Sequence, residues 1–378
     1  MLRKHPAPPI SMTPRPSFGW RRFGLFFGAA LLVAPLVWAG FDKGLAAYME
    51  GDYKTAFQEM QDAAQQGNQA AQNNLAVLYS TGRGVTADGA KAVEWWRKAA
   101  EQGNDEAAYN LGLALEVGQG IAKNDAEAAK WYRRSADSGN PSAQYNLGLL
   151  LLRRQDLFPD TGEALGRLRA AAEQSHLEAQ KELASRLGQA GADLPQSARW
   201  YRAAAEQGDA ESQRILGAMT ASGIGLPADQ KQAAYWYERA AQQGDVQAQI
   251  NLGRMYAEGT GVTVDAKAAY RWLGLAMTRA SSADQKTAAQ PLRDQQARKL
   301  TPQQIDDINA HIDRWRPQDP SFANLAPIDN DVIAVTDQPE KQQQTQTSRR
   351  TANSDCRSAL RNSIGTASRW TDDMTACQ

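Results

Sequence analysis

The chain has few of the residues that build catalytic and metal centres. Its 378 residues include two cysteines and three histidines, and the histidines, His5, His176 and His311, are far apart in sequence. Zinc sites and nucleophile–base pairs usually need such residues at short, characteristic spacings or in a shared motif. No P-loop, nucleotide-binding fingerprint or nucleophile elbow stands in a suitable context. We therefore expect no catalytic residue, no metal and no cofactor, and a protein that is not an enzyme. His176 is expected to be a surface turn residue.

An excess of charge of one sign is also lacking. The 42 Lys and Arg residues balance 42 Asp and Glu residues. The first 39 residues hold five basic side chains and no acidic one, so the rest of the chain is mildly acidic, with 37 basic and 42 acidic residues. Nucleic-acid binding depends on clustered Lys and Arg that neutralise phosphates. We therefore expect no nucleic-acid partner.

Long apolar runs are absent except near the start of the chain. Phe23 to Val37 are mostly apolar, follow a basic stretch, are interrupted by Pro35 and lead into a small-residue site at Ala39. This layout is typical of a secretory signal. We predict a signal peptide over residues 1–39, cleaved after Ala39, and hence a periplasmic protein.

Other interpretations of the N-terminal segment remain open. The stretch 23–41 is close to the ~20 apolar residues that a membrane span requires, so an uncleaved anchor in the inner membrane, facing the periplasm, is the alternative. Arg21 and Arg22 permit a twin-arginine signal, and Met12 is an alternative start.

A phrase of sequence returns at a fixed period along most of the chain. AAYNLGLALEVGQG at 107–120 reappears as AQINLGRMYAEGTG at 248–261. The leucine that anchors the phrase recurs every 36 residues, with one step of 33, and tryptophans follow it in the same register. The anchoring leucines are Leu75, Leu111, Leu147, Leu183, Leu216 and Leu252, and the tryptophans are Trp95, Trp131, Trp200, Trp236 and Trp272. Such a period predicts a repeat solenoid.

Each repeat has the pattern of two helices. Small and apolar residues share one helical face in the first helix, for example over Glu106 to Val117. A glycine pair such as Gly118 and Gly120 then suits a helix end and a tight turn. An acidic or amide residue follows, which is suited to cap the second helix. These predicted caps are Asp88, Asn124, Asp229 and Asp265.

The repeated residues A-Q/A-x-N-L-G, G-x-G-V, D, K-A and W-Y resemble the Sel-1-like repeat, a relative of the tetratricopeptide repeat. The resemblance implies an all-α, right-handed α-solenoid with six repeats over residues 69–277. The third repeat departs from it, because Arg154 and Asp156 replace the turn glycines, and its turn is expected to bulge. The fourth repeat is three residues short, which leaves its inter-helix angle open.

The repeats need capping units, since each buries its apolar face only against neighbours. Residues 40–68 suit a tetratricopeptide-like N-terminal cap, and 278–316 suit two closing helices, the second capped by Thr301. A Pro- and Gln-rich linker over 317–353 leads to an island over 354–378. Cys356 and Cys377 bracket that island, and we predict that they form a disulfide in an oxidising compartment.

The tryptophans recur at helix-packing positions, so we assign them to the core rather than to sugar binding. The asparagines before the leucines, Asn74, Asn110, Asn146 and Asn251, present two open interpretations. In related arrays the first helices line the concave face, so this row is a candidate partner-binding ladder. Alternatively, each asparagine bonds a neighbouring backbone carbonyl and fixes the stacking of repeats.

The resemblance implies a protein-binding role, since family members act in regulatory, secretion and envelope-assembly complexes. We therefore predict a non-catalytic periplasmic scaffold or adaptor that holds an envelope protein or peptide in its concave groove. The alternatives are an envelope hydrolase of β-lactam-binding type and a scaffold for exopolysaccharide export. The first is suggested by cysteine-rich members of the family, but this chain lacks their disulfide in every repeat.

Overall fold

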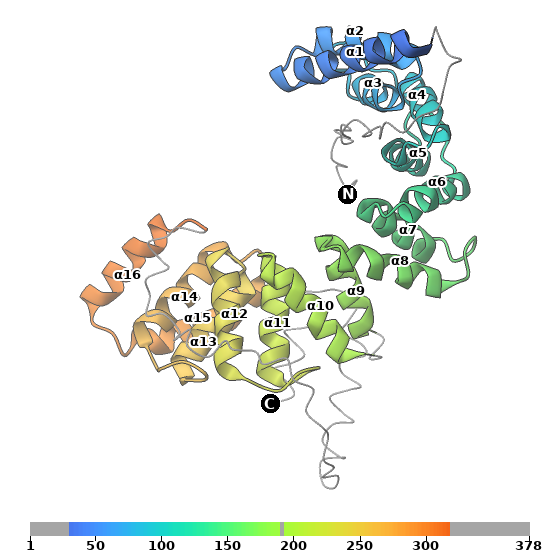
Figure 1. Cartoon of the computed structure of the whole chain (residues 1–378). Coiled ribbons are helices and arrows are strands. Elements are labelled where there is room, and N and C mark those ends of the chain that lie inside the picture. The colour runs from blue at the N-terminus through green and yellow to red at the C-terminus, as the bar shows by residue number, and fades with distance from the viewer. Residues whose placement is uncertain (1–29, 190–192, 318–378) are drawn as a thin grey trace. The chain divides into compact units, whose positions relative to one another are not determined.

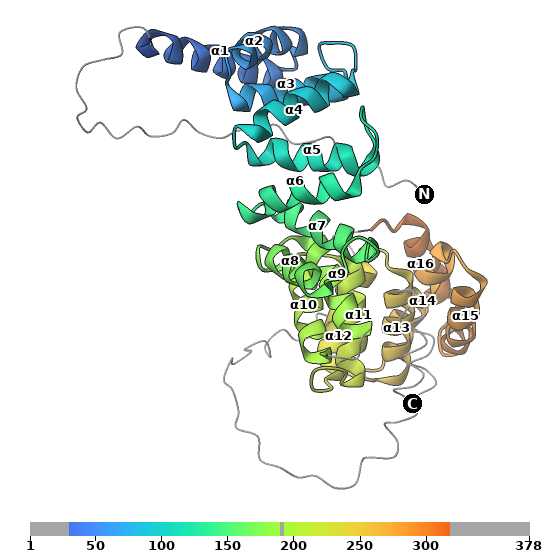
Figure 2. The ribbon, with the colours of Figure 1, turned by 90° about the vertical axis from the view of Figure 1, so that its right-hand side faces the viewer.

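A computed structural model describes residues 30–189 and 193–317, with side chains from Gly40 onward. These residues form sixteen α-helices and no strand. They divide into two compact units, one ending at His176 and one beginning at Leu177 (Figures 1 and 2). The predicted all-α solenoid of two-helix repeats is confirmed. The predicted linker, the island and the Cys356–Cys377 pair lie outside the described residues.

Most helices within the repeats contain thirteen residues. Unit 1 contains α1 (Ala30–Glu50), α2 (Tyr53–Gln65), α3 (Gln69–Thr81), α4 (Gly89–Glu101), α5 (Asp105–Val117), α6 (Asp125–Asp137), α7 (Pro141–Arg153) and α8 (Thr161–Glu173). Unit 2 contains α9 (Leu177–Gln189), α10 (Leu194–Glu206), α11 (Ala210–Ser222), α12 (Gln230–Gln242), α13 (Val246–Glu258), α14 (Ala266–Arg279), α15 (Ala283–Ala297) and α16 (Pro302–Arg314). Within each unit, consecutive helices pack side by side, except that α16 packs on α14 rather than on α15.

The helix α1 runs through Ala39 without a break. Most of the predicted signal peptide, residues 1–29, lies outside the described residues. Among the helices that the structure describes, none is long and apolar enough to span a membrane. Cleavage after Ala39 therefore stays a prediction.

Side-chain caps begin the second helices as the sequence predicts. Asp88 accepts a hydrogen bond from the backbone N–H of Lys91, and Asn124 does the same for Glu127. Asp229 and Asp265 cap α12 and α14 in the same way. Thr301 and Gln304 form a reciprocal capping box at α16. Each cap satisfies a backbone donor that the helix itself cannot pair.

The turn glycines also bring neighbouring repeats into backbone contact. Gly118 ends α5 in the left-handed region, at φ 80°. Gly120 lies against the first residue of α4 in the preceding repeat, and a Cβ added to it would overlap the carbonyl group of Gly89. The second glycine of three other turns approaches the first residue of the preceding second helix in the same way; these are Gly84, Gly225 and Gly261. We call the boundary between two successive repeats a joint, and this approach the glycine contact.

The core consists of the anchoring leucines, small alanines and large rings of the second helices, with Leu168 in place of a ring in α8. All six anchoring leucines are fully buried. Of the predicted core tryptophans, Trp200, Trp236 and Trp272 are buried, which confirms them. Trp95 and Trp131 are only partly buried, because the next ring in the chain, Trp96 or Tyr132, takes the central position of α4 or α6. The tryptophan prediction was therefore incomplete for the first two repeats.

Pairs of glutamines fasten the helix ends in several repeats. In the fifth repeat, Gln213 donates to the carbonyl of Ala205 at 3.0 Å, and its own oxygen accepts from Gln243 at 2.8 Å. The first, third and fourth repeats have the same side-chain pair, Gln72 with Gln102, Gln144 with Gln174, and Gln180 with Gln207. The second repeat has Ala108 and Ser138 instead. The pair is thus absent as a whole in the second repeat, whereas the sixth keeps Gln249 with Arg279 in the partner position, and among the described residues the buried Oε1 of Gln249 has no hydrogen-bond partner.

The two irregular repeats keep helices of normal length. In the third repeat α7 ends at Arg153, and Arg154 caps it with φ −112° instead of a left-handed glycine. The backbone N–H groups of Leu157 and Phe158 both donate to the carbonyl of Arg154. In the fourth repeat the deletion falls in the connection, which spans residues 190–193 where the first repeat has 82–88.

Candidate functional site

Side chains on the first helices link each repeat of unit 1 to the next. The Nδ2 of Asn110 on α5 donates to the Oδ1 of Asn73 on α3 at 3.1 Å. The Nδ2 of Asn146 on α7 donates to the hydroxyl of Tyr109 on α5 at 3.2 Å. Asn73 also donates to Glu106 at 3.4 Å. In the first two of these pairs the accepting residue, Asn73 or Tyr109, stands two positions before the anchoring leucine.

Two of the four predicted partner-binding asparagines lie inside the molecule. Asn74 is 0% exposed and Asn110 is 1% exposed. The Oδ1 of Asn74 accepts from Asn73 at 3.3 Å. The Oδ1 of Asn110 is buried and has no hydrogen-bond partner in the described part of the chain. A buried acceptor of this kind is costly unless a donor reaches it.

The other two asparagines are half-buried. Asn146 makes its hydrogen bond to Tyr109 from the surface of α7. Asn251 accepts from Gln247 of its own helix at 3.3 Å. Burial raises the pKa of Tyr237, and the side chain of Asn251 partly offsets that shift. A partner could reach Asn146 and Asn251 directly, whereas Asn74 and Asn110 would act on a partner only through the groups around them.

In unit 2 the same position before the leucine carries charge. Lys181 on α9 contacts Asp209 at 3.1 Å and Glu211 at 3.4 Å. Arg214 on α11, 7% exposed, pairs with Asp245 at 3.1 Å. The equivalent residue of the last repeat is not charged: Ile250 is buried and packs with Leu273 and Ala289 of the following helices. The last repeat thus meets the closing helices through an apolar contact.

Sequence reasoning singled out the asparagines and missed this neighbouring position. We call the residues two before the anchoring leucines the linking residues. They are Asn73, Tyr109, Tyr145, Lys181, Arg214 and Ile250. Aligning the repeats on the leucine would have shown a long or polar side chain in five of them. Because the residue type changes from repeat to repeat, no single-letter motif marks the position.

Partly exposed apolar side chains lie beside the linking residues of unit 1. Tyr109 and Leu113 stand four residues apart on α5, and Tyr145 and Leu149 do so on α7, so each pair shares one helical face. The ring of Tyr145 stacks on His176, with centroids 4.9 Å apart, so His176 is more than a surface turn residue. We call these four residues with Asn146 the first-helix surface. It combines aromatic, aliphatic and amide groups.

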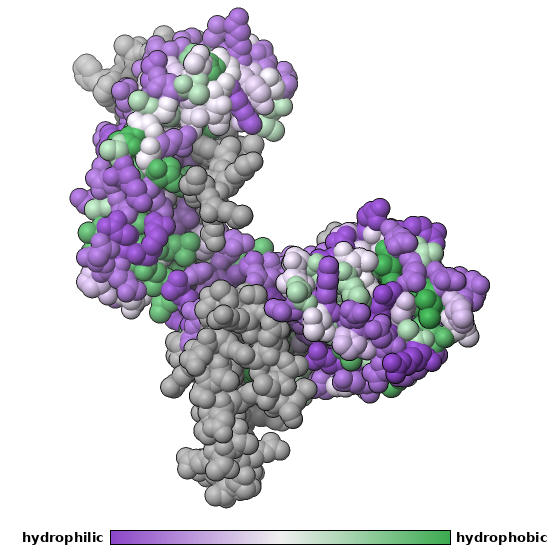
Figure 3. Space-filling view, turned by 180° about the vertical axis from the view of Figure 1, so that it is seen from behind, coloured by the Kyte–Doolittle hydropathy of each residue, from purple (hydrophilic) through white to green (hydrophobic). Residues whose placement is uncertain are grey.

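Large exposed apolar side chains elsewhere in the described residues are scattered. They are Met49, Val117, Leu157 and Val264. Figure 3 shows a mostly hydrophilic face on which apolar residues form small separate patches. The first-helix surface is therefore distinguished by its regular spacing rather than by a large apolar area.

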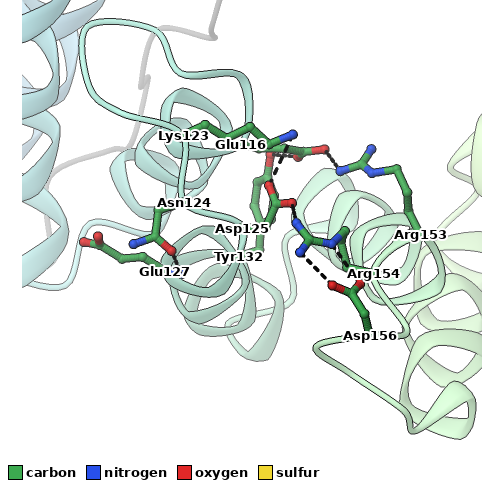
Figure 4. A network of polar contacts seen from close by, with 9 residues as sticks. All are labelled: Glu116, Lys123, Asn124, Asp125, Glu127, Tyr132, Arg153, Arg154 and Asp156. Atoms are coloured by element: carbon green, nitrogen blue, oxygen red, sulfur yellow. Dashed lines mark hydrogen bonds and ion pairs between the residues drawn. The ribbon is translucent and has the colours of Figure 1, made fainter.

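Ion pairs connect the second and third repeats (Figure 4). The guanidinium of Arg153 at the end of α7 pairs with Glu116 of α5 at 2.7 Å. Glu116 also accepts from the hydroxyl of Tyr132 at 2.7 Å. Burial, followed by the negative charge of Glu116, raises the pKa of Tyr132 well above its ordinary value. Tyr132 therefore remains a neutral hydrogen-bond donor.

The adjacent Arg154 forms a second cluster. It pairs with Asp125, the first residue of α6, and with Asp156 at 2.8 Å (Figure 4). The side chain of Asp125 is 1% exposed, and Lys123 lies 3.6 Å from its other oxygen. The hydrogen bond from Arg154 lowers the pKa of Asp156. These residues form a structural network and present no nucleophile with an adjacent base.

One half-buried acid, Glu238, stands apart from these networks. Burial raises the pKa of Glu238 on α12 to about 7, and its charge acts on Tyr256 of α13. A carboxyl group with such a pKa is a candidate for acid–base chemistry when a second group and a cleft accompany it. In the residues that the structure describes, no three His, Cys, Asp or Glu side chains are grouped so that they could hold a metal ion.

Comparison with known proteins gives one family. The Sel1 repeat matches six consecutive segments, residues 69–104, 105–140, 141–176, 177–209, 210–245 and 246–277. A crystal structure of a protective antigen present in uropathogenic Escherichia coli strains, which displays the same type of repeat fold, is 28% identical with a TM-score of 0.58. The alignment covers 82% of this chain and 66% of that one, so the chain spans slightly less than two thirds of its length.

A second similar structure is a Sel1 repeat protein from Oxalobacter formigenes. It is 32% identical with a TM-score of 0.49, and the alignment covers 64% of this chain and 98% of that one. No curated protein sequence matches the chain.

Proposed function

This chain belongs to the Sel1 repeat family, and from that premise we propose that it is a non-catalytic adaptor of the bacterial cell envelope. Sel1 repeat proteins generally mediate protein–protein interactions. We propose further that the partner is an envelope protein or peptide and that it binds along the first helices. The periplasmic location follows from the predicted signal peptide, with membrane anchoring by the same segment as the alternative.

The observation that carries the proposal is the first-helix surface of unit 1. Tyr109, Leu113, Tyr145 and Leu149 are partly exposed at a regular spacing, and Asn146 places an amide between them. Aromatic side chains with a polar group are favoured at protein interfaces because they bury a large area at little entropic cost. An amide can fix the register of an extended peptide by hydrogen bonding to its backbone.

Capture from intact cells tests the proposal. Crosslinking with a tag after Gln378 is compared between the wild type and two variants, Asn74→Ala with Asn110→Ala and Asn146→Ala with Asn251→Ala. The first variant changes buried amides, so we expect reduced thermal stability. The second changes half-buried amides, so we expect weaker capture of an envelope protein by a folded chain.

A further variant separates binding from stacking. Leu149→Glu places a charge on the first-helix surface without removing a hydrogen bond. Val264→Glu, at a 57% exposed residue of unit 2, is the matched control. Loss of the same envelope protein in Leu149→Glu but not in the control supports the adaptor. Unchanged capture by Leu149→Glu and by the Asn146→Ala with Asn251→Ala variant would refute binding at this surface.

A further inference from the structure

The joint between the second and third repeats is built differently from its neighbours. At the joint between the first and second repeats, Gly120 places its backbone directly against Gly89, the first residue of the preceding second helix. The third repeat has Asp156 at the position of that glycine and Arg154 at the position of the helix-ending glycine. A side chain at position 156 cannot make the glycine contact, because Cβ would take the space of the backbone.

At the second–third joint, ion pairs between side chains replace that backbone contact. Arg154 reaches back to the carboxylate of Asp125, the first residue of α6, and Asp156 holds the same guanidinium from the other side at 2.8 Å. Asp125 occupies in its repeat the position that Gly89 occupies in the first, so the turn still contacts the first residue of the preceding second helix, now through Arg154. A contact between backbones has become a contact between charged side chains.

Three more arginine–carboxylate pairs cross the same joint. They are Arg153 with Glu116 at 2.7 Å, Arg133 with Glu163 at 2.9 Å, and Arg167 with Asp137 at 2.6 Å. One such pair, Arg97 with Glu127, crosses the joint between the first and second repeats. The second–third joint therefore combines the loss of a backbone contact with a concentration of ion pairs.

We propose that this joint is a salt-sensitive lock that holds α5 and α7 at a fixed separation. The two helices carry the first-helix surface, so the lock sets its width. The inference concerns the joint alone and does not depend on the proposed adaptor function. In the structure all four arginines of this joint are paired; they are Arg133, Arg153, Arg154 and Arg167. Weakening these ion pairs lets the third repeat move relative to the second.

The geometry makes the lock accessible to dissolved ions. The side chains of Arg153 and Arg154 are 52% and 32% exposed, so dissolved ions reach the guanidinium groups, although the partners Glu116 and Asp125 are only 16% and 1% exposed. Exposed pairs weaken as the Debye length falls from about 10 Å at 0.1 M salt to about 3 Å at 1 M. The glycine contact depends on close packing of uncharged backbone, which salt does not screen. Salt should therefore loosen this joint, whereas the first joint, crossed by the single pair Arg97–Glu127, stays held by its glycine contact.

Distance measurement between spin labels tests the lock on the full chain. Labels at Val117→Cys and Leu157→Cys report on the second–third joint, since both native side chains are exposed. Labels at Thr86→Cys and Ala122→Cys report on the first–second joint and serve as the control. Cys356→Ser and Cys377→Ser remove the native cysteines from every sample. Circular dichroism at both salt concentrations verifies that the helices persist.

We expect the Val117–Leu157 distance distribution to broaden between about 0.1 M and 1 M salt, over which screening becomes strong, while the control distribution stays the same. The triple variant Asp125→Gln, Arg154→Gly and Asp156→Gly copies the residues of the fifth–sixth joint, Gln230, Gly259 and Gly261. It should lose the salt response. Arg154→Met, which keeps most of the volume without the charge, should give a broad distribution at both salt concentrations.

Three results would overturn the proposal. The first is an unchanged Val117–Leu157 distribution at the two salt concentrations. The second is an equal response of the control labels, which would mean that salt loosens the repeats in general. The third is a full salt response in Arg154→Met, which would show that the guanidinium does not hold the joint. The Arg154→Met result also decides the question if the triple variant does not fold.

Discussion

Replacing Gly118 or Gly120 by alanine should lower the free energy of unfolding by different amounts, although the two glycines lie in one turn. Gly118 and Gly120 lie in the same turn at φ 80° and φ 74°, so alanine is strained at both. A Cβ on Gly118 would have its nearest neighbours at 3.6 Å, an ordinary contact. A Cβ on Gly120 would overlap the carbonyl of Gly89 and lie 2.6 Å from the backbone nitrogen of Ala90.

The expected loss of stability follows from backbone strain and from steric overlap of the added Cβ. The left-handed backbone costs an alanine about 1–2 kcal/mol at either position. Overlap with a packed neighbour adds about 1–3 kcal/mol at Gly120, and backbone atoms cannot rotate away as a side chain can. We therefore expect Gly118→Ala to lower the free energy of unfolding by about 1–2 kcal/mol and Gly120→Ala by about 2–5 kcal/mol.

Urea unfolding followed by far-ultraviolet circular dichroism measures the difference. Because repeat proteins do not always unfold in one step, hydrogen exchange of the α4 and α6 amides gives a local check. Exchange should accelerate on both sides of the joint in Gly120→Ala. Gly139→Ala, at φ 95° with nothing near its added Cβ, is the control for backbone strain alone. Equal losses in all three variants would refute the steric role of the glycine contact.

Three other predictions concern single groups. Gln243→Ala should lower the free energy of unfolding by about 1–3 kcal/mol, because it leaves the oxygen of buried Gln213 without a donor, and adding Gln213→Ala should recover part of this loss in urea unfolding. The raised pKa of Glu238 means that its ionisation opposes folding, so this contribution to stability is fully favourable below about pH 4.5 and is lost as the pH rises to about 7. Glu238→Gln should therefore raise the melting temperature at pH 8 but not at pH 4; an equal change at both would contradict this assignment. Protein purified from the cell envelope should show no free thiol at Cys356 or Cys377 until it is reduced, as mass spectrometry after alkylation would reveal.

Sequence was sufficient for the regular part of the fold. The period of the leucines located all six repeats, and cap residues such as Asp88 and Asn124 placed helix starts to the residue. Capping depends on a few consecutive residues and the backbone between them, so local sequence determines it. For the same reason the capping box at Thr301 was predictable without knowledge of the packing around it.

The candidate site was less accessible to sequence reasoning. Asn74 and Asn110 have the pattern of exposed ladder residues, yet both are buried. Their burial depends on side chains a whole repeat away, such as Asn73 for Asn110, and the repeat period does not report these contacts. The linking residues always stand two positions before the leucine, but their residue type differs from repeat to repeat. A search for a repeated residue type therefore does not find them. Likewise, the loss of glycine at 154 predicted a bulge but not an ion pair to Asp125.

The glycine contact also changes what counts as the transferable module of this protein. Gly120 belongs to the second repeat by sequence, but its close neighbour, Gly89, belongs to the first. A recombination point placed at the boundary between two repeats would separate the two residues that make each glycine contact. A cut between the second turn glycine and the second helix, within 121–124, would instead keep Gly120 with Gly89 on one side and Asp125 with Arg154 on the other. Shuffled arrays cut within 121–124 or 262–265 should therefore fold more often than arrays cut at the repeat boundaries.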